Sequence, residues 1–242
     1  MASAHCTTEL GNHLNKGIES QFKMERVIPY FQPIMNLLNN RVWRYECLAR
    51  LLGDSEHIFL PSDFLNLVEK KNMNADLTHH IYEESRRYCA QRNMPWSINL
   101  SDSDLDDESL VAWLIHQHEN SKSTLFGIEI SHACLQSHLP VLTLLRQKCP
   151  NLAISVDDVA FLSPALERAL SLKLTAVKLS GNLVKDESLD KEQLRNLIAS
   201  CKSTKTKVVA EHIESQATLD TVTSFGIEFG QGYFLSSPAA SV

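Results

Sequence analysis

Short apolar segments alternate along the chain with longer segments whose apolar residues recur at helical spacing. Apolar runs of this length are typical of buried strands. Eight of them are predicted to be strands: residues 27–34, 41–48, 96–100, 125–130, 152–156, 176–179, 207–210 and 227–229. The segment MNLLNN between the first two is too short for a helical crossover, so these two strands should be antiparallel. The later strands, which are separated by helical segments, should run parallel.

The helical segments begin and end at recognisable residues. Helix starts are expected at Ser62, at Asn74 and at Ser163, where Pro164 follows in the first turn. Two further helices are expected over residues 187–201 and 215–226. Their apolar faces are formed by Leu194, Leu197, Ile198 and Cys201 in the first and by Leu219, Val222 and Phe225 in the second, which closes on Gly226.

Eight strands with interleaved helices in about 240 residues predict an α/β fold, a TIM-type (β/α)8 barrel with an antiparallel first strand. We expect residues 23–242 to form this barrel domain. Residues 1–22 are polar and are predicted to be an N-terminal helix or the remnant of a linker to another domain.

Composition and charge narrow the functional classes. With 43% hydrophobic and 21% charged residues, the chain is an ordinary globular protein, and its net charge of −6 without a cluster of basic residues disfavours binding to DNA or to an anionic membrane surface. The six cysteines include no C-x-x-C pair, so they are interpreted as reduced thiols of a cytoplasmic protein. No apolar run approaches the roughly 20 residues of a membrane span, and no signal-peptide pattern is visible at the N-terminus.

Polar side chains stand at the ends of most predicted strands. In barrels of this kind the active site lies at the carboxyl ends of the strands. The residues at these ends are Glu46, Asn99, Glu129, Asp157, Asp158, Lys178, Glu211 and Gln231. Each alone is usually a solvated group, but carboxylates that converge on one barrel mouth repel one another unless cations are bound. Oxygen donors without cysteine or paired histidine fit Mg²⁺ or Mn²⁺ better than Zn²⁺, and one aspartate of the pair could bridge two ions.

The same residues carry a family resemblance. Eight short motifs follow one another in order: YFQPI (30–34), ECLAR (46–50), INLS (98–101), IEIS (128–131), VDD (156–158), VK (177–178), VVAEHIE (208–214) and QGYFLSSP (231–238). This series resembles the EAL domain family over residues 21–238. Members of that family are β/α barrels with an antiparallel first strand that bind cyclic di-GMP, and active members hydrolyse it to the linear dinucleotide pGpG. The resemblance implies a cyclic di-GMP phosphodiesterase that uses two Mg²⁺ or Mn²⁺ ions and is inhibited by Ca²⁺. It also implies a homodimer and an upstream sensor domain or partner protein.

The resemblance implies a role for each site residue. Glu46, Asn99, Glu129 and Asp157 would hold one ion, and Asp157, Asp158 and Glu211 would lie near the other. Lys178, Glu211 and Asp158 would take part in catalysis, with Lys178 contacting the attacking water or the phosphate. Gln32 and Arg50 would hold the dinucleotide, Gln231 would support the waters of the metal site, and Glu214 and His132 would be supporting positions.

The chain departs from the family pattern after the paired aspartates. Where the family has Phe-Gly-Thr-Gly-Tyr-Ser-Ser, this chain has residues 159–164, VAFLSP, and the glutamate that anchors this loop in the family is His132. His132 is therefore interpreted as a partly exposed loop histidine rather than a metal ligand. We expect Pro164 to stiffen the loop and Phe161 and Leu162 to bury part of it.

Two functional classes stay open at this point. The complete set of expected ligands favours a phosphodiesterase that is slow or regulated. The altered loop favours a catalytically weak or inactive domain that senses cyclic di-GMP or binds another protein. Hydrolysis of some other phosphodiester is a weaker alternative, because Gln32 and Arg50 match the nucleotide-binding pattern.

Overall fold

The computed structural model describes residues 18–120, 125–181 and 191–242. Within these ranges, nine strands form one sheet in the order β1-β9-β8-β7-β6-β5-β4-β2-β3, and β1 also pairs with β2. The strands are β1 (Val27–Asn36), β2 (Arg41–Leu52), β3 (Ile58–Phe59), β4 (Trp96–Leu100), β5 (Phe126–Ser131), β6 (Ala153–Val159), β7 (Ala176–Leu179), β8 (Lys207–Ala210) and β9 (Phe229–Gly230). The β1–β2 pairing closes eight strands into a barrel, and β3 extends the end of β2 outside it.

The strand directions agree with the prediction. β1 is antiparallel to both of its neighbours, β2 and β9, whereas the pairs from β2–β4 round to β8–β9 are parallel. The prediction of an α/β barrel with an antiparallel first strand is confirmed. The two-residue strand β3 was not predicted, because a segment this short carries no periodic pattern.

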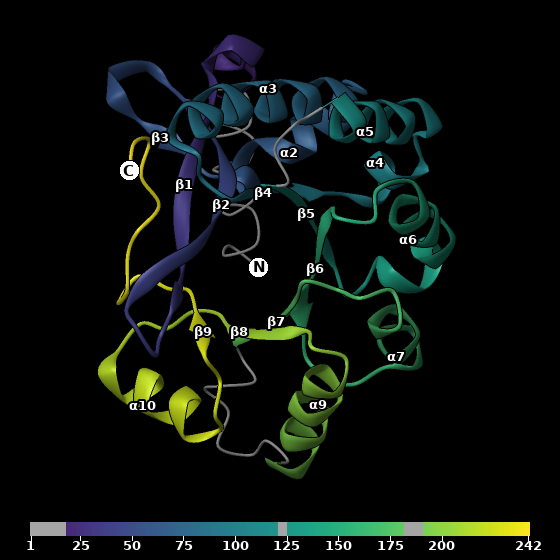
Figure 1. Cartoon of the computed structure of the whole chain (residues 1–242). Helices are drawn as coiled ribbons and strands as arrows, with labels where there is room; N and C mark the ends of the chain where they lie inside the picture. Colours follow the sequence, from purple (N-terminus) through teal and green to yellow (C-terminus); the bar gives the residue numbers. More distant parts are fainter. Residues whose placement is uncertain (1–17, 121–124, 182–190) are drawn as a thin grey trace, which may run out of the picture.

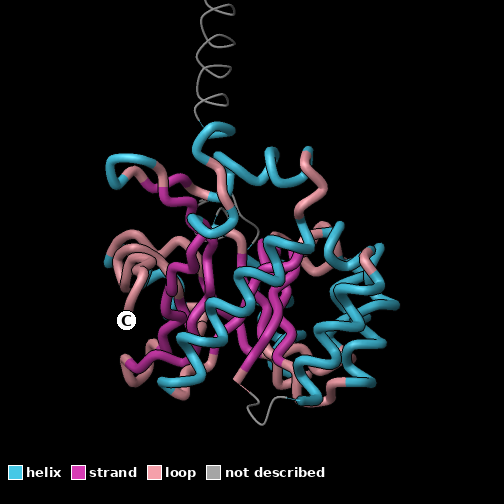
Figure 2. Tube along the Cα trace, turned by 90° about the horizontal axis from the view of Figure 1, so that it is seen from above, coloured by secondary structure: helices cyan, strands magenta, loops and turns pink. Residues whose placement is uncertain are grey.

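Helices surround the barrel (Figure 1). They are η1 (Met24–Arg26), η2 (Asp54–Glu56), α2 (Pro61–Lys70), α3 (Asn74–Arg92), α4 (Asp102–Asp106), α5 (Glu108–Asn120), α6 (Leu135–Lys148), α7 (Pro164–Leu170), α9 (Lys191–Ser203) and α10 (Gln216–Ser224). In the view turned by 90°, the strands lie in the interior and the helices outside them (Figure 2). In the described part of the chain, no helix is long and apolar enough to cross a bilayer.

The predicted helix starts meet different outcomes. Ser163 caps α7 as expected, since its hydroxyl accepts a hydrogen bond from the Leu166 backbone N–H at 3.1 Å. α3 begins at Asn74, as predicted, with Met73 rather than Asn74 at the cap position. The prediction for Ser62 is wrong, because this residue lies inside the first turn of α2. α2 starts at Pro61, which has no backbone N–H to leave unpaired and already has a helical φ angle. Its first turn is closed by Asp63, whose carboxylate accepts the Leu60 N–H at 2.7 Å.

The ends and apolar faces of the last two helices agree with the pattern. The four apolar residues predicted to share one face of α9 are all buried against the barrel: Leu194, Leu197, Ile198 and Cys201. Gly226 follows α10 with a φ of +69°, a left-handed conformation that glycine adopts without strain. The expected start of the α9 segment, residues 187–190, lies outside the described residues.

Gly127 on β5 leaves room for the buried side chain of Arg44 on β2. Arg44 lies two residues before Glu46 on the same face of β2, is buried, and donates from Nη1 to the Trp96 carbonyl at 3.0 Å. A Cβ atom on Gly127 would lie only 2.2 Å from Nη1 of Arg44. Glycine at this position of β5 is therefore required by the arginine. The sequence analysis did not select Arg44, since a single arginine in a strand is ordinarily exposed.

Candidate active site at the barrel mouth

The barrel brings residues from six strands to one level at its mouth. Glu46 comes from β2, Glu129 from β5, Asp157 from β6 and Lys178 from β7, while Glu211 follows β8 directly. The register places Asn99 of β4 opposite Glu129 and Gln32 of β1 opposite Glu46. The structure therefore brings these seven predicted residues together, although they are distributed over most of the sequence.

Lys178 lies at the centre of this group. Its Nζ atom is 2.9 Å from Oε2 of Glu46, 2.8 Å from Oε2 of Glu129, 2.9 Å from Oε1 of Glu211 and 3.6 Å from Oδ1 of Asp157. The side chain is only 1% exposed. Burial alone would lower the pKa of Lys178, but the four carboxylates raise this pKa well above its usual value. The ammonium group is therefore a permanent counter-charge inside the site.

Neighbouring amides orient the carboxylate of Glu46. Nδ2 of Asn99 donates to its Oε1 at 2.7 Å, and Nε2 of Gln231 donates to its Oε2 at 2.8 Å. The same Nε2 atom donates to Oε1 of Gln32 at 3.0 Å. These contacts fix the position of the Glu46 carboxylate on two sides.

Ser97 orients the carboxylate of Glu129, because its hydroxyl donates a short hydrogen bond to Oε1. Glu129 is completely buried. The sequence analysis did not select Ser97. It could have been found as the residue two positions before Asn99, which alternation places on the same face of β4.

The pKa values of the acid groups are raised by burial and by neighbouring carboxylates and lowered by Lys178, and the balance differs from one group to the next. Burial raises the pKa of Glu129 to about 7, although Lys178 opposes the shift. Burial and Asp157 raise the pKa of Glu211 well above its usual value, against the opposing effect of Lys178. Burial would also raise the pKa of Asp157, but Lys178 and a hydrogen bond from Glu211 lower it. Glu211 therefore holds a proton more readily than Asp157 does.

The donor set fits a divalent cation. One carboxylate oxygen from each of Glu46, Glu129 and Asp157 lies within 4.8 Å of the others. Buried carboxylate oxygens of this kind are the ligands that Mg²⁺, Mn²⁺ and Ca²⁺ take in proteins. A cation bound there would replace the proton held by the carboxyl groups.

Asp158 does not join this cluster. It is exposed, its φ angle is +52°, and its backbone N–H donates to Oδ1 of Asp157 at 2.8 Å. The pairing of β6 with β7 shifts register between Val156 and Val159, the segment that contains both aspartates. Glu214 is likewise exposed and lies outside the cluster.

The altered loop is held by His132. Its Nε2 atom and Oγ of Ser163 are hydrogen-bonded at 2.8 Å, and its backbone N–H donates to the Asp157 carbonyl at 2.7 Å. His132 is partly exposed, as predicted, and burial lowers its pKa. Leu162 packs against the core, so part of the loop is buried as predicted, whereas the Phe161 side chain is 55% exposed and makes an edge contact with the His132 ring at 5.1 Å.

The two residues predicted to hold a dinucleotide lie on the inward face near the same mouth. Gln32 is buried and donates from Nε2 to the Ser236 carbonyl at 3.2 Å. Arg50 is buried near the end of β2, donates to the Ala49 carbonyl at 2.8 Å and lies over the Tyr30 ring at 5.8 Å.

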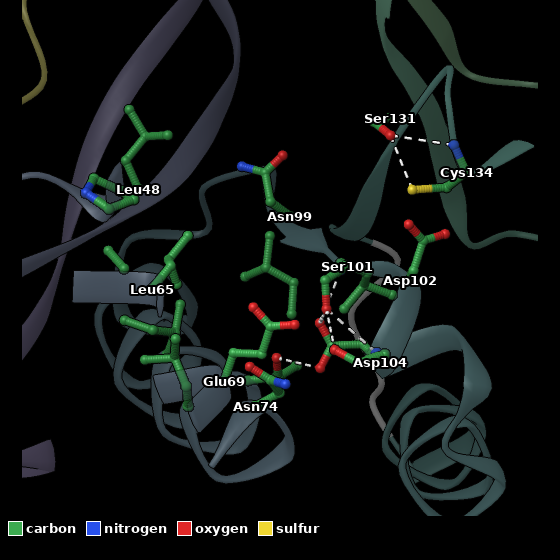
Figure 3. Close-up of a pocket in the computed structure, with 18 of the residues that line it drawn as sticks. Leu48, Leu65, Glu69, Asn74, Asn99, Ser101, Asp102, Asp104, Ser131 and Cys134 are labelled. Carbon is green, nitrogen blue, oxygen red and sulfur yellow. Dashed lines mark hydrogen bonds between the residues drawn. The ribbon is translucent and has the colours of Figure 1, made fainter. Parts of the chain in front are cut away.

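A cavity of about 870 Å³ opens beside the carboxylates (Figure 3). Glu46, Asn99 and Asp157 line one part of it, and residues of α2 and α3 line another. Its volume lies in the range of sites that bind small organic ligands. The candidate metal centre thus adjoins a space large enough for a substrate.

The structural class of this protein is a β/α barrel with an antiparallel first strand, whose mouth holds buried carboxylates around a lysine and a candidate site for a divalent cation. A family model for the EAL domain matches residues 15–238, and the chain belongs to this family.

Individual relatives are distant in sequence. The chain is 22% identical over 234 residues to the cyclic di-GMP phosphodiesterase PdeB of Shewanella oneidensis, a match that covers 91% of this chain and 27% of PdeB. It therefore spans about a quarter of the length of that relative. The PaMucR phosphodiesterase in complex with c-di-GMP matches with a TM-score of 0.80 at 19% identity, over 94% of this chain and 97% of that one.

The Bacillus subtilis YkuI protein, whose structure contains substrate c-di-GMP and calcium, matches with a TM-score of 0.76 at 20% identity. This match covers 94% of this chain and 59% of YkuI. At these identities the structural matches establish the fold.

Proposed function

We propose that this domain is a phosphodiesterase that hydrolyses cyclic di-GMP to pGpG with two divalent cations, Mg²⁺ or Mn²⁺. The observation that carries the proposal is the group of buried carboxylates around Lys178, oriented by amides and a hydroxyl and open to a ligand-sized cavity. Membership of the EAL domain family and the similarity to proteins named as cyclic di-GMP phosphodiesterases support the choice of substrate.

In the proposed reaction a water oxygen bonds to phosphorus, one P–O3′ bond breaks, and the 3′ oxygen leaves as a hydroxyl. Bound divalent cations would lower the pKa of the attacking water and compensate the charge that develops on the phosphoryl oxygens. Glu46, Asn99, Glu129 and Asp157 would hold the first ion, and Asp157, Asp158 and Glu211 would lie near the second.

The remaining residues act on substrate and protons. Lys178 is charged and buried, so it would stabilise negative charge on the phosphate or orient the water. Burial raises the pKa of Glu211, so a cation that binds there would have to displace any proton on this carboxyl group before Glu211 becomes a ligand. Arg50 would hold a phosphate through its planar donors, and Gln32 and Gln231 would support the dinucleotide and the waters of the metal site.

The proposal also includes inhibition by Ca²⁺, the cellular location of the domain and its assembly with other chains or domains. Ca²⁺ would bind and inhibit, because its larger and looser coordination misplaces the nucleophile. We place the domain in the cytoplasm, as a homodimer and under the control of a sensor domain or partner protein. The length of PdeB supports the control by a further domain, since most of that protein lies outside the matched region.

One observation favours a second candidate, a domain that binds cyclic di-GMP with little or no turnover. Asp158 is exposed and lies outside the group of carboxylates formed by Glu46, Glu129 and Asp157, so the second ion would lack one of its expected ligands. A site of this kind binds a nucleotide and one cation but places the attacking water poorly.

Purified protein with labelled cyclic di-GMP separates the two candidates. Binding and pGpG formation are followed in parallel with Mg²⁺, with Mn²⁺ and with EDTA. The phosphodiesterase produces pGpG only with Mg²⁺ or Mn²⁺, whereas a binder retains the dinucleotide unchanged. Absence of both binding and product would overturn the proposed substrate.

A further inference from the structure

The cavity beside the metal centre contains more acid groups than the metal centre uses. Six carboxylate residues line it: Glu46, Glu69, Asp102, Asp104, Asp106 and Asp157. Their partners show which of them already have a structural task.

Three of the six are fully engaged. Glu46 and Asp157 belong to the cluster around Lys178. Asp104 is buried and closes the first turn of α4: it accepts from Oγ1 of Thr78 at 2.9 Å, and from the backbone N–H and Oγ of Ser101 at 2.8 Å and 2.6 Å.

Two more face a histidine. Oδ1 of Asp106 is 3.1 Å from Nε2 of His138, and Oδ1 of Asp102 is 3.3 Å from its Nδ1. The carboxylate of the sixth, Glu69, has no hydrogen bond or ion pair to any residue in the described part of the chain.

Two carboxamides accompany Glu69 on the same side of the cavity. Asn66 lies one turn before it on α2, and Asn74 is the first residue of α3. Neither side-chain amide is hydrogen-bonded within residues 18–120, 125–181 and 191–242. Figure 3 shows the Glu69 carboxylate and the Asn74 carboxamide next to each other, directed into the cavity.

Apolar side chains form the walls around these polar groups. They are Leu48, Leu65, Leu77, Ile81, Ile98 and Leu100. A flat aromatic ring could be enclosed between them, while its edge meets the carboxylate and the amide. Apolar walls with a few convergent polar groups are the usual design of a site that selects one small ligand.

The polar groups are complementary to guanine. Its Watson–Crick edge presents two adjacent donors, N1–H and the N2 amino group, beside the acceptor O6, and a carboxylate accepts both donors while a carboxamide N–H donates to O6. Adenine presents the acceptor N1 at the corresponding place, so it would face the carboxylate with no hydrogen atom between them.

We propose that Glu69 is the specificity-determining residue that accepts N1–H and N2–H of one guanine of the substrate, with Asn74 donating to O6 of the same base. The inference rests on the proposed function, since it names the base-reading residues of that site.

The test compares cyclic di-GMP with cyclic di-AMP by titration calorimetry, in the presence of Ca²⁺, for the whole chain and its variants. Wild-type protein should bind cyclic di-GMP at least about a hundredfold more tightly than cyclic di-AMP, because the wrong base leaves the polar groups of the site unpaired. Glu69→Gln replaces one acceptor oxygen by a donor, so affinity for cyclic di-GMP should fall about tenfold or more and the preference should shrink accordingly. Asn74→Ala should weaken cyclic di-GMP binding to a smaller extent.

Lys70→Gln is the matched control, because Lys70 is the exposed neighbour of Glu69 on α2 and does not line the cavity. This variant should bind both dinucleotides as wild type does. If Glu69→Gln keeps the wild-type affinity and preference, the inference is overturned while the proposed function stands. If wild-type protein binds neither dinucleotide, both fail. Glu69 is exposed, so its replacement leaves the core unchanged.

Discussion

Lys178 is the residue on which the electrostatics of the mouth depend. It contacts carboxylates from three other strands and the segment after β8. Removing one partner of a buried ion pair is costly, because the charges that remain lose their compensation inside the protein.

Lys178→Met should therefore destabilise the protein and stop turnover. We expect the free energy of unfolding in EDTA, measured with urea, to fall by about 3 kcal/mol. The rate of pGpG formation should fall at least about a hundredfold, equivalent to about 2.7 kcal/mol of barrier. Lys173→Met, at an exposed lysine, is the control and should change neither quantity. Unchanged stability of the Lys178 variant would show that the ammonium group is not a necessary counter-charge.

Individual residues also show where sequence reasoning succeeded and where it did not. Strand ends predicted Glu46, Glu129 and Lys178 because barrel topology decides which end of each strand carries the site. Arg44 was missed because its burial depends on a missing Cβ at Gly127, on another strand. No local pattern around either residue contains that information.

At the scale of elements, His138 connects α6 to α4. It is buried, it donates to the Cys134 carbonyl at 2.9 Å, and it faces Asp102 and Asp106 of α4. Burial alone would lower the pKa of His138, but the bond to Cys134 and the two aspartates raise it above its usual value. α4 follows β4 directly, so this contact supports the strand that carries Asn99.

The contact should stabilise the fold in a pH-dependent way. Since the pKa of His138 is higher in the folded than in the unfolded state, the stabilisation is complete below the unfolded value of about 6.5 and is lost as pH rises through the folded value. His138→Gln should therefore lose more stability at pH 6 than at pH 8.5. Both aspartates are largely exposed, so screening limits the difference to roughly 0.5 kcal/mol.

Urea unfolding at the two pH values measures this difference. His116→Gln, at an exposed histidine on α5, is the control and should show none. An equal loss at pH 6 and pH 8.5 for His138→Gln would mean that the ion pairs contribute nothing.

The loop after β6 is the second element with a measurable consequence. Its residue Ser163 is hydrogen-bonded to His132, and Asp158 is turned to solvent. Replacing residues 159–163 by the glycine-containing family loop, together with His132→Glu, should let Asp158 approach the second ion. We expect turnover to rise at least about tenfold, equivalent to about 1.4 kcal/mol of barrier.

His132→Glu without the loop is the control for this graft and should have little effect. A graft that folds and binds cyclic di-GMP with two metal ions, but forms no pGpG, would identify the protein as a binder.

Element boundaries were predictable where pattern and topology agree. The predicted ranges 96–100, 176–179 and 207–210 coincide with β4, β7 and β8. α3 begins at Asn74 as predicted, but the start of α2 was assigned to Ser62, which lies inside its first turn. The preference of Pro61 for the first helical position explains this difference.

At the scale of the whole molecule, barrel closure converts distant sequence positions into one site. Glu46 and Glu211 both lie 2.9 Å from Lys178, although they are far apart along the chain. The order of strands and the alternation of their side chains were sufficient to predict this convergence. The cavity was not predictable, because its shape depends on how α2 and α3 pack beside the mouth.

The most direct test of the account compares wild-type protein with Asp157→Asn for pGpG formation over a titration of Mg²⁺ or Mn²⁺. The substitution keeps the shape of the side chain and removes the charge proposed to bridge two ions. Circular dichroism and urea unfolding verify that the variant is folded, and Asp220→Asn, at an exposed residue of α10, serves as the control. The account predicts metal-dependent product from wild type and from the control, and at least about a hundredfold less from Asp157→Asn at every metal concentration. Equal turnover by Asp157→Asn, or turnover by wild type that persists in EDTA, would contradict it.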